Sequence, residues 1–281
     1  MEQAKVNFHL TEKDFHLTFI FLTIFEIMQQ RNDIIQLKNA PLKEVIFEIH
    51  WDLDVMPEQN MSVDTGFETA VLNFRNACQQ DFKYVELLTP SMIPAVVFNN
   101  KVTHRFFKEK DSYPLYQFGP GVFTVNDNNK NYSWTEFRTL ILNGIKCLRS
   151  SYEKKIVISK IELRYIDSVS INTFGEANKF DFLKHHLQVN PEPYPFVDGE
   201  LDSINFTKRF IIDEEIILNI MVATAFDIKS NDEVAIWHTF INNRKRINNE
   251  QLEKWIDKAH ENASATFKKM ISKQLYEYFN N

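Results

Sequence analysis

The sequence predicts an α+β protein, an antiparallel sheet with three main helices packed on it. Several segments alternate apolar and polar residues, which is typical of strands. Three others carry apolar residues at helical spacing, at residues 65–82, 133–150 and 249–271. Many of the strands follow one another directly, which favours antiparallel pairing. We expect residues 40–281 to form a single domain and residues 1–39 an N-terminal extension.

The first half of the domain begins with a strand at residues 45–53, in which alternate residues are apolar. Thr65-x-x-Glu68 has the pattern of a capping box and predicts the start of the first helix. Strands are expected around residues 95–109 and 115–126, and the second contains a turn or bulge at Gly119-Pro120-Gly121. A second capping box, Ser133-x-x-Glu136, predicts the start of the second helix.

The second half begins with a strand at residues 156–171, followed by a loop-rich stretch with a short helix near 180–187. Three strands then follow closely, at 204–212, 216–226 and 235–242. The three residues between the first two of these strands suit a tight hairpin. The final helix has an apolar stripe that runs from Leu252 to Met270.

The N-terminal extension contains a dense apolar stretch at residues 15–28. It is too short to span a bilayer, which takes about 20 apolar residues. It could be an extra strand or helix on the core, a docking segment for a partner, or a product of an upstream start codon with Met28 as the natural start. We predict that Phe19, Phe21 and Ile24 bury against the body or a partner, because an exposed apolar patch invites aggregation.

Composition restricts the classes of function. The 281 residues carry a net charge of −6 without long runs of one sign, whereas proteins that bind nucleic acid usually show a basic excess. Only six glycines are present, and they form no phosphate-binding loop of the Rossmann or P-loop kind. The two cysteines, Cys78 and Cys147, are expected to be buried thiols in a reducing compartment. The sequence therefore predicts a cytoplasmic protein with no cofactor and no membrane association.

A polar sheet face is the first candidate site. Glu48, His50 and Asp52 lie on one face of the first strand, and Glu162 and Arg164 are expected beside them on a second strand. We expect these groups to pair across the strands; the alternative is a groove that binds an anion or a metal. Asp52 and Asp54 also resemble the paired aspartates of haloacid dehalogenase phosphatases, but the alternating strand and the absence of a doubly wound pattern argue against that chemistry. We predict neither a metal site nor catalytic residues.

Two further regions are candidates for binding. Aromatic residues gather around the Gly-Pro-Gly turn and could stack on a ligand or form a corner of the core: Phe118, Phe123, Tyr132 and Trp134. The run Arg244-Lys245-Arg246 is the strongest basic cluster and the candidate nucleic-acid patch.

Residues 40–49 (APLKEVIFEI), 118–126 (FGPGVFTVN) and 163–167 (LRYID) together resemble a family of sporadically distributed, uncharacterised prokaryotic proteins of about this size. The resemblance covers about residues 40–275 and leaves out residues 1–36. Asp167 stands where members of that family commonly carry asparagine. The resemblance implies no activity, but the patchy occurrence of the family resembles that of mobile defence and toxin–antitoxin genes.

These observations favour a non-enzymatic protein-interaction component of a small prokaryotic operon, of the antiviral defence or toxin–antitoxin type. We expect a protein partner or a homo-oligomer. A ligand- or nucleic-acid-binding module is the alternative, and a metal-dependent hydrolase is the least favoured class.

Overall fold

The computed structural model describes residues 37–56, 61–88, 95–190, 196–199 and 201–281. The chain divides into two compact units at residue 37, and the following description concerns the second unit, Lys38–Asn281. The predictions for residues 15–28, including the burial of Phe19, Phe21 and Ile24, lie outside the described residues.

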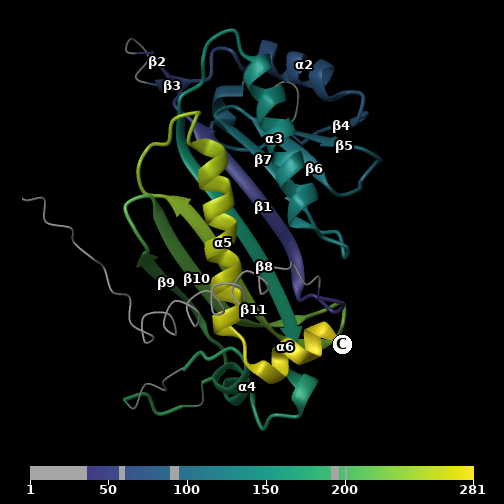
Figure 1. Ribbon diagram of the computed structural model, residues 1–281, viewed down its shortest axis with the longest axis vertical. Helices are drawn as coiled ribbons and strands as arrows, with labels where there is room; N and C mark the ends of the chain where they lie inside the picture. The colour runs from purple at the N-terminus through teal and green to yellow at the C-terminus, as the bar shows by residue number, and fades with distance from the viewer. Residues whose placement is uncertain (1–36, 57–60, 89–94, 191–195, 200) are drawn as a thin grey trace, which may run out of the picture. The chain divides into compact units, whose positions relative to one another are not determined.

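One nine-stranded antiparallel sheet forms the centre of this unit (Figure 1). The strand order is β4-β5-β6-β7-β1-β8-β11-β10-β9. The strands are β1 Leu42–Trp51, β4 Tyr84–Leu87, β5 His104–Phe107, β6 Leu115–Gly119, β7 Val122–Asp127, β8 Ile158–Ser170, β9 Asn205–Ile211, β10 Ile216–Asp227 and β11 Asp232–Asn243. A separate hairpin joins β2 Asp54–Met56 to β3 Met61–Val63. The predicted α+β class with an antiparallel sheet is confirmed.

The long helices cover one face of this sheet (Figure 1). They are α2 Phe67–Cys78, α3 Trp134–Ser151 and α5 Leu252–Met270. Two short helices, α4 Lys179–His186 and α6 Lys273–Asn280, pack against each other. The prediction of three main helices was therefore incomplete, because the part of the chain that the structure describes contains five α-helices. Of the two additional helices, α4 matches the short helix expected near residues 180–187, whereas α6 was not expected. The Ser272 side chain accepts a hydrogen bond from the Leu275 N–H and so caps α6 after α5 has ended.

The core lies between the sheet and the long helices. In β1 every second side chain points into it, and Val45, Phe47 and Ile49 are fully buried. The opposite residues of β1 are partly exposed, as the alternation predicts. Phe74 of α2 packs within this core against four aromatic rings of the sheet: Phe106, Tyr116, Phe118 and Phe123.

Both predicted capping boxes were wrong in detail, although the helices begin close to the expected positions. The N-cap residue of α2 is Gly66, and the Thr65 hydroxyl donates instead to the carboxylate of Asp54. Ser133 is the N-cap of α3 but makes no side-chain capping bond. In the first case the hydroxyl takes part in a tertiary hydrogen bond, and the helix begins one residue later with a glycine that has no side chain to cap it.

The strand expected at residues 95–109 was also wrong over its first part. Residues Ala95–Phe98 form a 3₁₀ turn, and only His104–Phe107 form a strand. The sequence analysis did not predict β4, whose four residues are all exposed and so show no alternation of burial. The hairpin predicted at residues 213–215 is present, since the Asp213 carboxylate accepts from the N–H groups of Glu215 and Ile216 and closes the turn between β9 and β10.

The Gly119-Pro120-Gly121 segment forms the hairpin between β6 and β7, in which Gly119 pairs with Val122. Gly121 has a φ of +77°, a conformation that favours glycine. The chain at residues 100–103 crosses close to this turn: the Asn100 N–H donates to the Pro120 carbonyl at 2.7 Å. None of the described helices is long and apolar enough to cross a membrane.

Candidate functional site

The sheet face opposite the long helices carries a polar network that joins the central strands β1 and β8. Glu48 of β1 and Glu162 of β8 are directly opposite in the register. Lys160 bridges them, with its Nζ 3.1 Å from a Glu48 carboxylate oxygen and 3.2 Å from one of Glu162. Arg164 donates to the other oxygen of Glu162, and the amide of Asn242 donates to Glu162 at 2.7 Å. Every carboxylate in this row therefore has a cationic or amide partner.

The electrostatics of this row agree with structural pairing. Partial burial alone raises the pKa of Glu48, but the hydrogen bond from His50 and the charge and hydrogen bond of Lys160 outweigh it and lower the pKa to about 2. Burial lowers the pKa of Lys160, while the carboxylates of Glu162 and Glu48 raise it more, so that the net shift is upward. The charged forms of both groups are thus stabilised by each other.

Of the five residues proposed for this face, the structure brings four together: Glu48, His50, Glu162 and Arg164. His50 Nε2 lies 2.7 Å from the Glu48 carboxylate. Asp52 is separate, because β1 ends at Trp51, and its carboxylate pairs with Arg246. Asp54 pairs with Lys154, so Asp52 and Asp54 do not face a common cation. The sequence analysis missed Lys160. Alternate residues of a strand lie on the same face, so Lys160 could have been placed beside Glu162 and Arg164.

The polar row makes a testable contribution to acid stability. Because the pKa of Glu48 is lowered in the folded protein, its stabilisation is present above about pH 4.5 and is lost as the pH falls toward 2. We expect Glu48→Gln to lower the free energy of unfolding by about 2 kcal/mol at pH 7 and by much less at pH 2, with solvent screening included. Urea denaturation at both pH values measures this, and an equal loss at both would show that the charge of Glu48 is not what stabilises the fold.

The aromatic candidates divide between two places. Phe118 and Phe123 are fully buried core residues. Tyr132 and Trp134, at the start of α3, join a buried polar cluster with Tyr165 and His260: the hydroxyls of Tyr132 and Tyr165 are 3.1 Å apart, and the Tyr165 hydroxyl lies 2.8 Å from His260 Nδ1. The Trp134 ring stacks on the His260 imidazole at 3.9 Å between centroids.

Burial lowers the pKa of His260 to about 4, so its imidazole is neutral near pH 7. The chain of bonds is satisfied if Tyr132 donates to Tyr165 and Tyr165 donates to Nδ1 of His260. No pattern along the chain indicates this cluster, because His260 and Tyr165 are 95 residues apart and come together through the packing of α5 on β8.

The basic run is largely engaged with neighbouring groups. Arg246 pairs with Asp52, and Lys245 Nζ lies 2.5 Å from the carboxylate of Glu214. Arg244 donates to the backbone carbonyl of Asp213 at 3.3 Å. These contacts neutralise two of the three cations that the sequence suggested for nucleic-acid binding.

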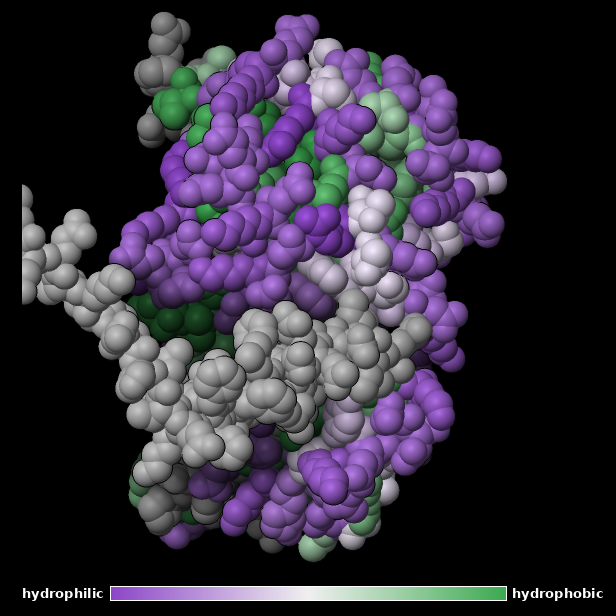
Figure 2. Space-filling view, viewed as in Figure 1, coloured by the Kyte–Doolittle hydropathy of each residue, from purple (hydrophilic) through white to green (hydrophobic). Residues whose placement is uncertain are grey.

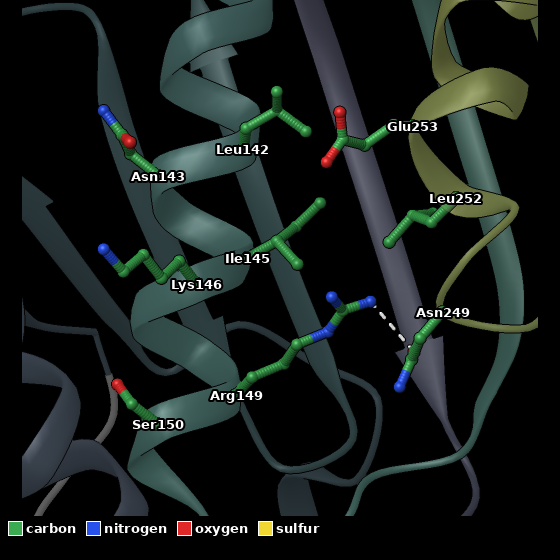
Figure 3. A pocket seen from close by; sticks show the side chains of 9 residues that line it. All are labelled: Leu142, Asn143, Ile145, Lys146, Arg149, Ser150, Asn249, Leu252 and Glu253. Atoms are coloured by element: carbon green, nitrogen blue, oxygen red, sulfur yellow. Dashed lines mark hydrogen bonds between the residues drawn. The ribbon is translucent and has the colours of Figure 1, made fainter.

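A cleft of about 540 Å³ lies between α3 and the start of α5. Figure 3 shows Leu142, Ile145 and Arg149 directed from α3 toward α5, with Leu252 directed back from α5. Hydrophobic side chains are also visible between the hydrophilic outer faces of the two helices in Figure 2. The guanidinium of Arg149 donates to the Asn249 side chain at 2.9 Å, while its Nε is buried without a hydrogen-bond partner. Burial lowers the pKa of Arg149, and the charge of Glu253, which also lines the cleft, opposes that shift only in part.

Within the described residues, no group of three or more His, Cys, Asp or Glu side chains is arranged to hold a metal ion. The chain matches no protein family model, and no curated protein or solved structure matches it significantly.

Proposed function

We propose that this protein works by binding another protein, as a non-enzymatic component of a small prokaryotic operon of the defence or toxin–antitoxin type. The observation that carries the proposal is the edge of the sheet at β9. Phe210, Ile211 and Ile212 there are 42%, 61% and 44% exposed. No described strand pairs with the outer side of β9, so within the described residues its outer backbone donors and acceptors have no strand partner. An open edge with apolar side chains is a template for strand pairing with another chain.

Two other features support a binding role. The carboxylates and cations of the polar sheet face pair with one another. This pairing is typical of a structural network, so the proposal places the binding surface at the edge of the sheet and not on this face. The operon context rests on the sequence resemblance of residues 40–275 to a patchily distributed prokaryotic family.

The test is purification of the tagged full chain from its native host, with identification and quantification of what remains bound. We expect one protein at near-equal stoichiometry, retained after nuclease treatment and in 0.5 M salt. Salt-sensitive retention of RNA or DNA without a protein partner would contradict the proposal, because phosphate contacts weaken steeply with salt.

The cleft between α3 and α5 favours a second candidate function, the binding of a small organic anion. Its volume lies within the range of small-molecule sites, and its lining combines the apolar side chains of α3 and α5 with the guanidinium of Arg149, whose Nε has no hydrogen-bond partner. We expect 10 mM phenyl phosphate to raise the melting temperature of the wild-type chain and of Arg75→Gln, an exposed control, but not that of Arg149→Gln. An equal response of all three proteins in differential scanning fluorimetry would exclude this cleft as the binding site.

A further inference from the structure

The sheet contains an internal duplication that the strand order reveals. In the first half, a central strand (β1) is followed by α2, a meander that runs from the edge inward (β4 to β7), and the long helix α3. In the second half, a central strand (β8) is followed by α4, an inward meander (β9 to β11), and the long helix α5. The two halves meet where β1 and β8 pair antiparallel, as a local twofold axis requires.

Side chains at the junction repeat as well. Glu48 and Glu162 face each other across the axis. Each is bonded by the residue two positions later in its own strand: His50 contacts Glu48, and Arg164 contacts Glu162. Phe47 and Ile161, the residues before the two glutamates, are both fully buried. This agreement fixes which residue of one half corresponds to which residue of the other.

From this junction the register can be followed outward in both directions. On one side Glu48 pairs with β7, β6, β5 and β4 in turn, through Thr124, Gln117, Arg105 and Glu86. On the other side Glu162 pairs with β11, β10 and β9 in turn, through Asn242, Ile217 and Ile211. Arg105 and Ile211 therefore correspond, but Arg105 has β4 beside it whereas Ile211 has no described strand on its outer side.

The corresponding residues also differ in burial. Phe106, next to Arg105, is fully buried and packs on Phe74 of α2, whereas its counterpart Ile212 is 44% exposed. Among the described residues, the second half therefore has no counterpart of β4, and β9 with its exposed apolar side chains forms the last described strand on that side.

We infer that a protein partner supplies the tenth strand, antiparallel to β9, as an extended segment with apolar residues opposite Phe210 to Ile212 and acidic residues opposite Lys208 and Arg209. This inference rests on the proposed function and specifies its partner. Arg209 is exposed and makes no ion pair among the described residues, and Lys208 contacts only the ring of Phe206, at 5.4 Å. These cations disfavour a second copy at the same edge, since two β9 strands paired about their centre would bring four positive charges together.

The probe is a labelled peptide with capped ends and the sequence Thr-Val-Val-Val-Glu-Glu-Thr. When it pairs antiparallel to β9, its valines lie opposite Ile212 to Phe210 and its glutamates opposite Arg209 and Lys208. We expect fluorescence anisotropy to show binding to the full chain, and hydrogen exchange to slow at residues 205–212 but not at the opposite edge, 84–87. Arg209→Glu should weaken binding at least tenfold and favour the matched peptide that carries lysines in place of the glutamates. Arg75→Glu, an exposed arginine of α2, is the control and should bind as the wild type does.

Three results would overturn the inference: no protection of residues 205–212 by the peptide, equal affinity of Arg209→Glu and wild type, or a dimer of the chain joined through β9. The proposed function is tested separately. If the partner from the native host is retained equally by wild type and Arg209→Glu, the protein-interaction function stands and the tenth-strand inference fails. If no partner is found in either case, the proposed function fails.

Discussion

Asp167→Asn should stabilise the protein by about 4 kcal/mol at pH 8 and have almost no effect at pH 3.5. Asp167 lies on the helix side of β8 and is 4% exposed, and its carboxyl group makes no hydrogen bond or ion pair with another described residue. Burial raises its pKa to about 7 from an ordinary value of 3.8. The magnitude follows from this difference of about 3 pKa units, at about 1.4 kcal/mol per unit.

The sign follows from the two protonation equilibria. Below pH 3.8 the carboxyl is protonated in both the folded and the unfolded chain, so ionisation makes no difference. Between pH 3.8 and about 7 the unfolded chain releases the proton and the folded chain keeps it, so the free energy of unfolding falls as the pH rises. Above about pH 7 both states are ionised and the free energy of unfolding falls no further. Asparagine has the same shape and does not titrate.

Urea denaturation of both proteins at pH 3.5 and pH 8 measures the effect, with Asp81→Asn as an exposed control. A variant less stable than wild type at pH 8 would mean that the Asp167 carboxylate is ionised and paired in the native protein.

Gly119→Ala should destabilise the fold by about 3 kcal/mol, which is at the upper end of the usual cost of overpacking. A Cβ at Gly119 would lie 1.9 Å from the backbone oxygen of Lys101. That oxygen cannot rotate away, because residues 100–103 are held against the β6–β7 hairpin by the bonds from Asn100 N–H to Pro120 and from Thr103 N–H to Phe118.

Gly175→Ala is the matched control for this substitution. Gly175 has a φ of +67°, but a Cβ there meets no atom within 4 Å, so only the backbone strain of about 1 kcal/mol remains. Thermal and urea unfolding of both variants should therefore rank Gly119→Ala well below Gly175→Ala. Equal losses would show that the chain at Lys101 moves away without cost.

The sequence predicted those features that depend on local periodicity. The alternation in β1 and the apolar stripes of α3 and α5 are long enough to identify a strand and two helices, and they correspond to what the structure shows. It failed where the signal is short or the determining contact is distant. The strand β4 has four exposed residues and no alternation, and the expected cap Thr65 donates to Asp54 while Gly66 is the N-cap of α2.

The polar row on β1 and β8 could also be predicted where it depends on local periodicity. Glu48, His50, Glu162 and Arg164 could be placed together because each pair shares a strand and both strands alternate. A buried cluster outside this row could not be predicted: the Asp64 carboxylate accepts from the side chains of Trp51 and Tyr152 and from the Gly121 N–H, groups that are distant in the sequence. No pattern along one segment encodes such a convergence.

The pairing of β1 with β8 also determines how the chain can fold. Phe47 and Leu163 are adjacent in the sheet but 116 residues apart (163 − 47), whereas the strands of each meander pair with near neighbours in sequence. Closing so long a loop costs more conformational entropy than closing a hairpin, so the two meanders should form before the centre of the sheet does. The bridge from Lys160 to Glu48 then forms only when the halves join. Substitutions at that bridge should speed unfolding and leave the rate of folding nearly unchanged.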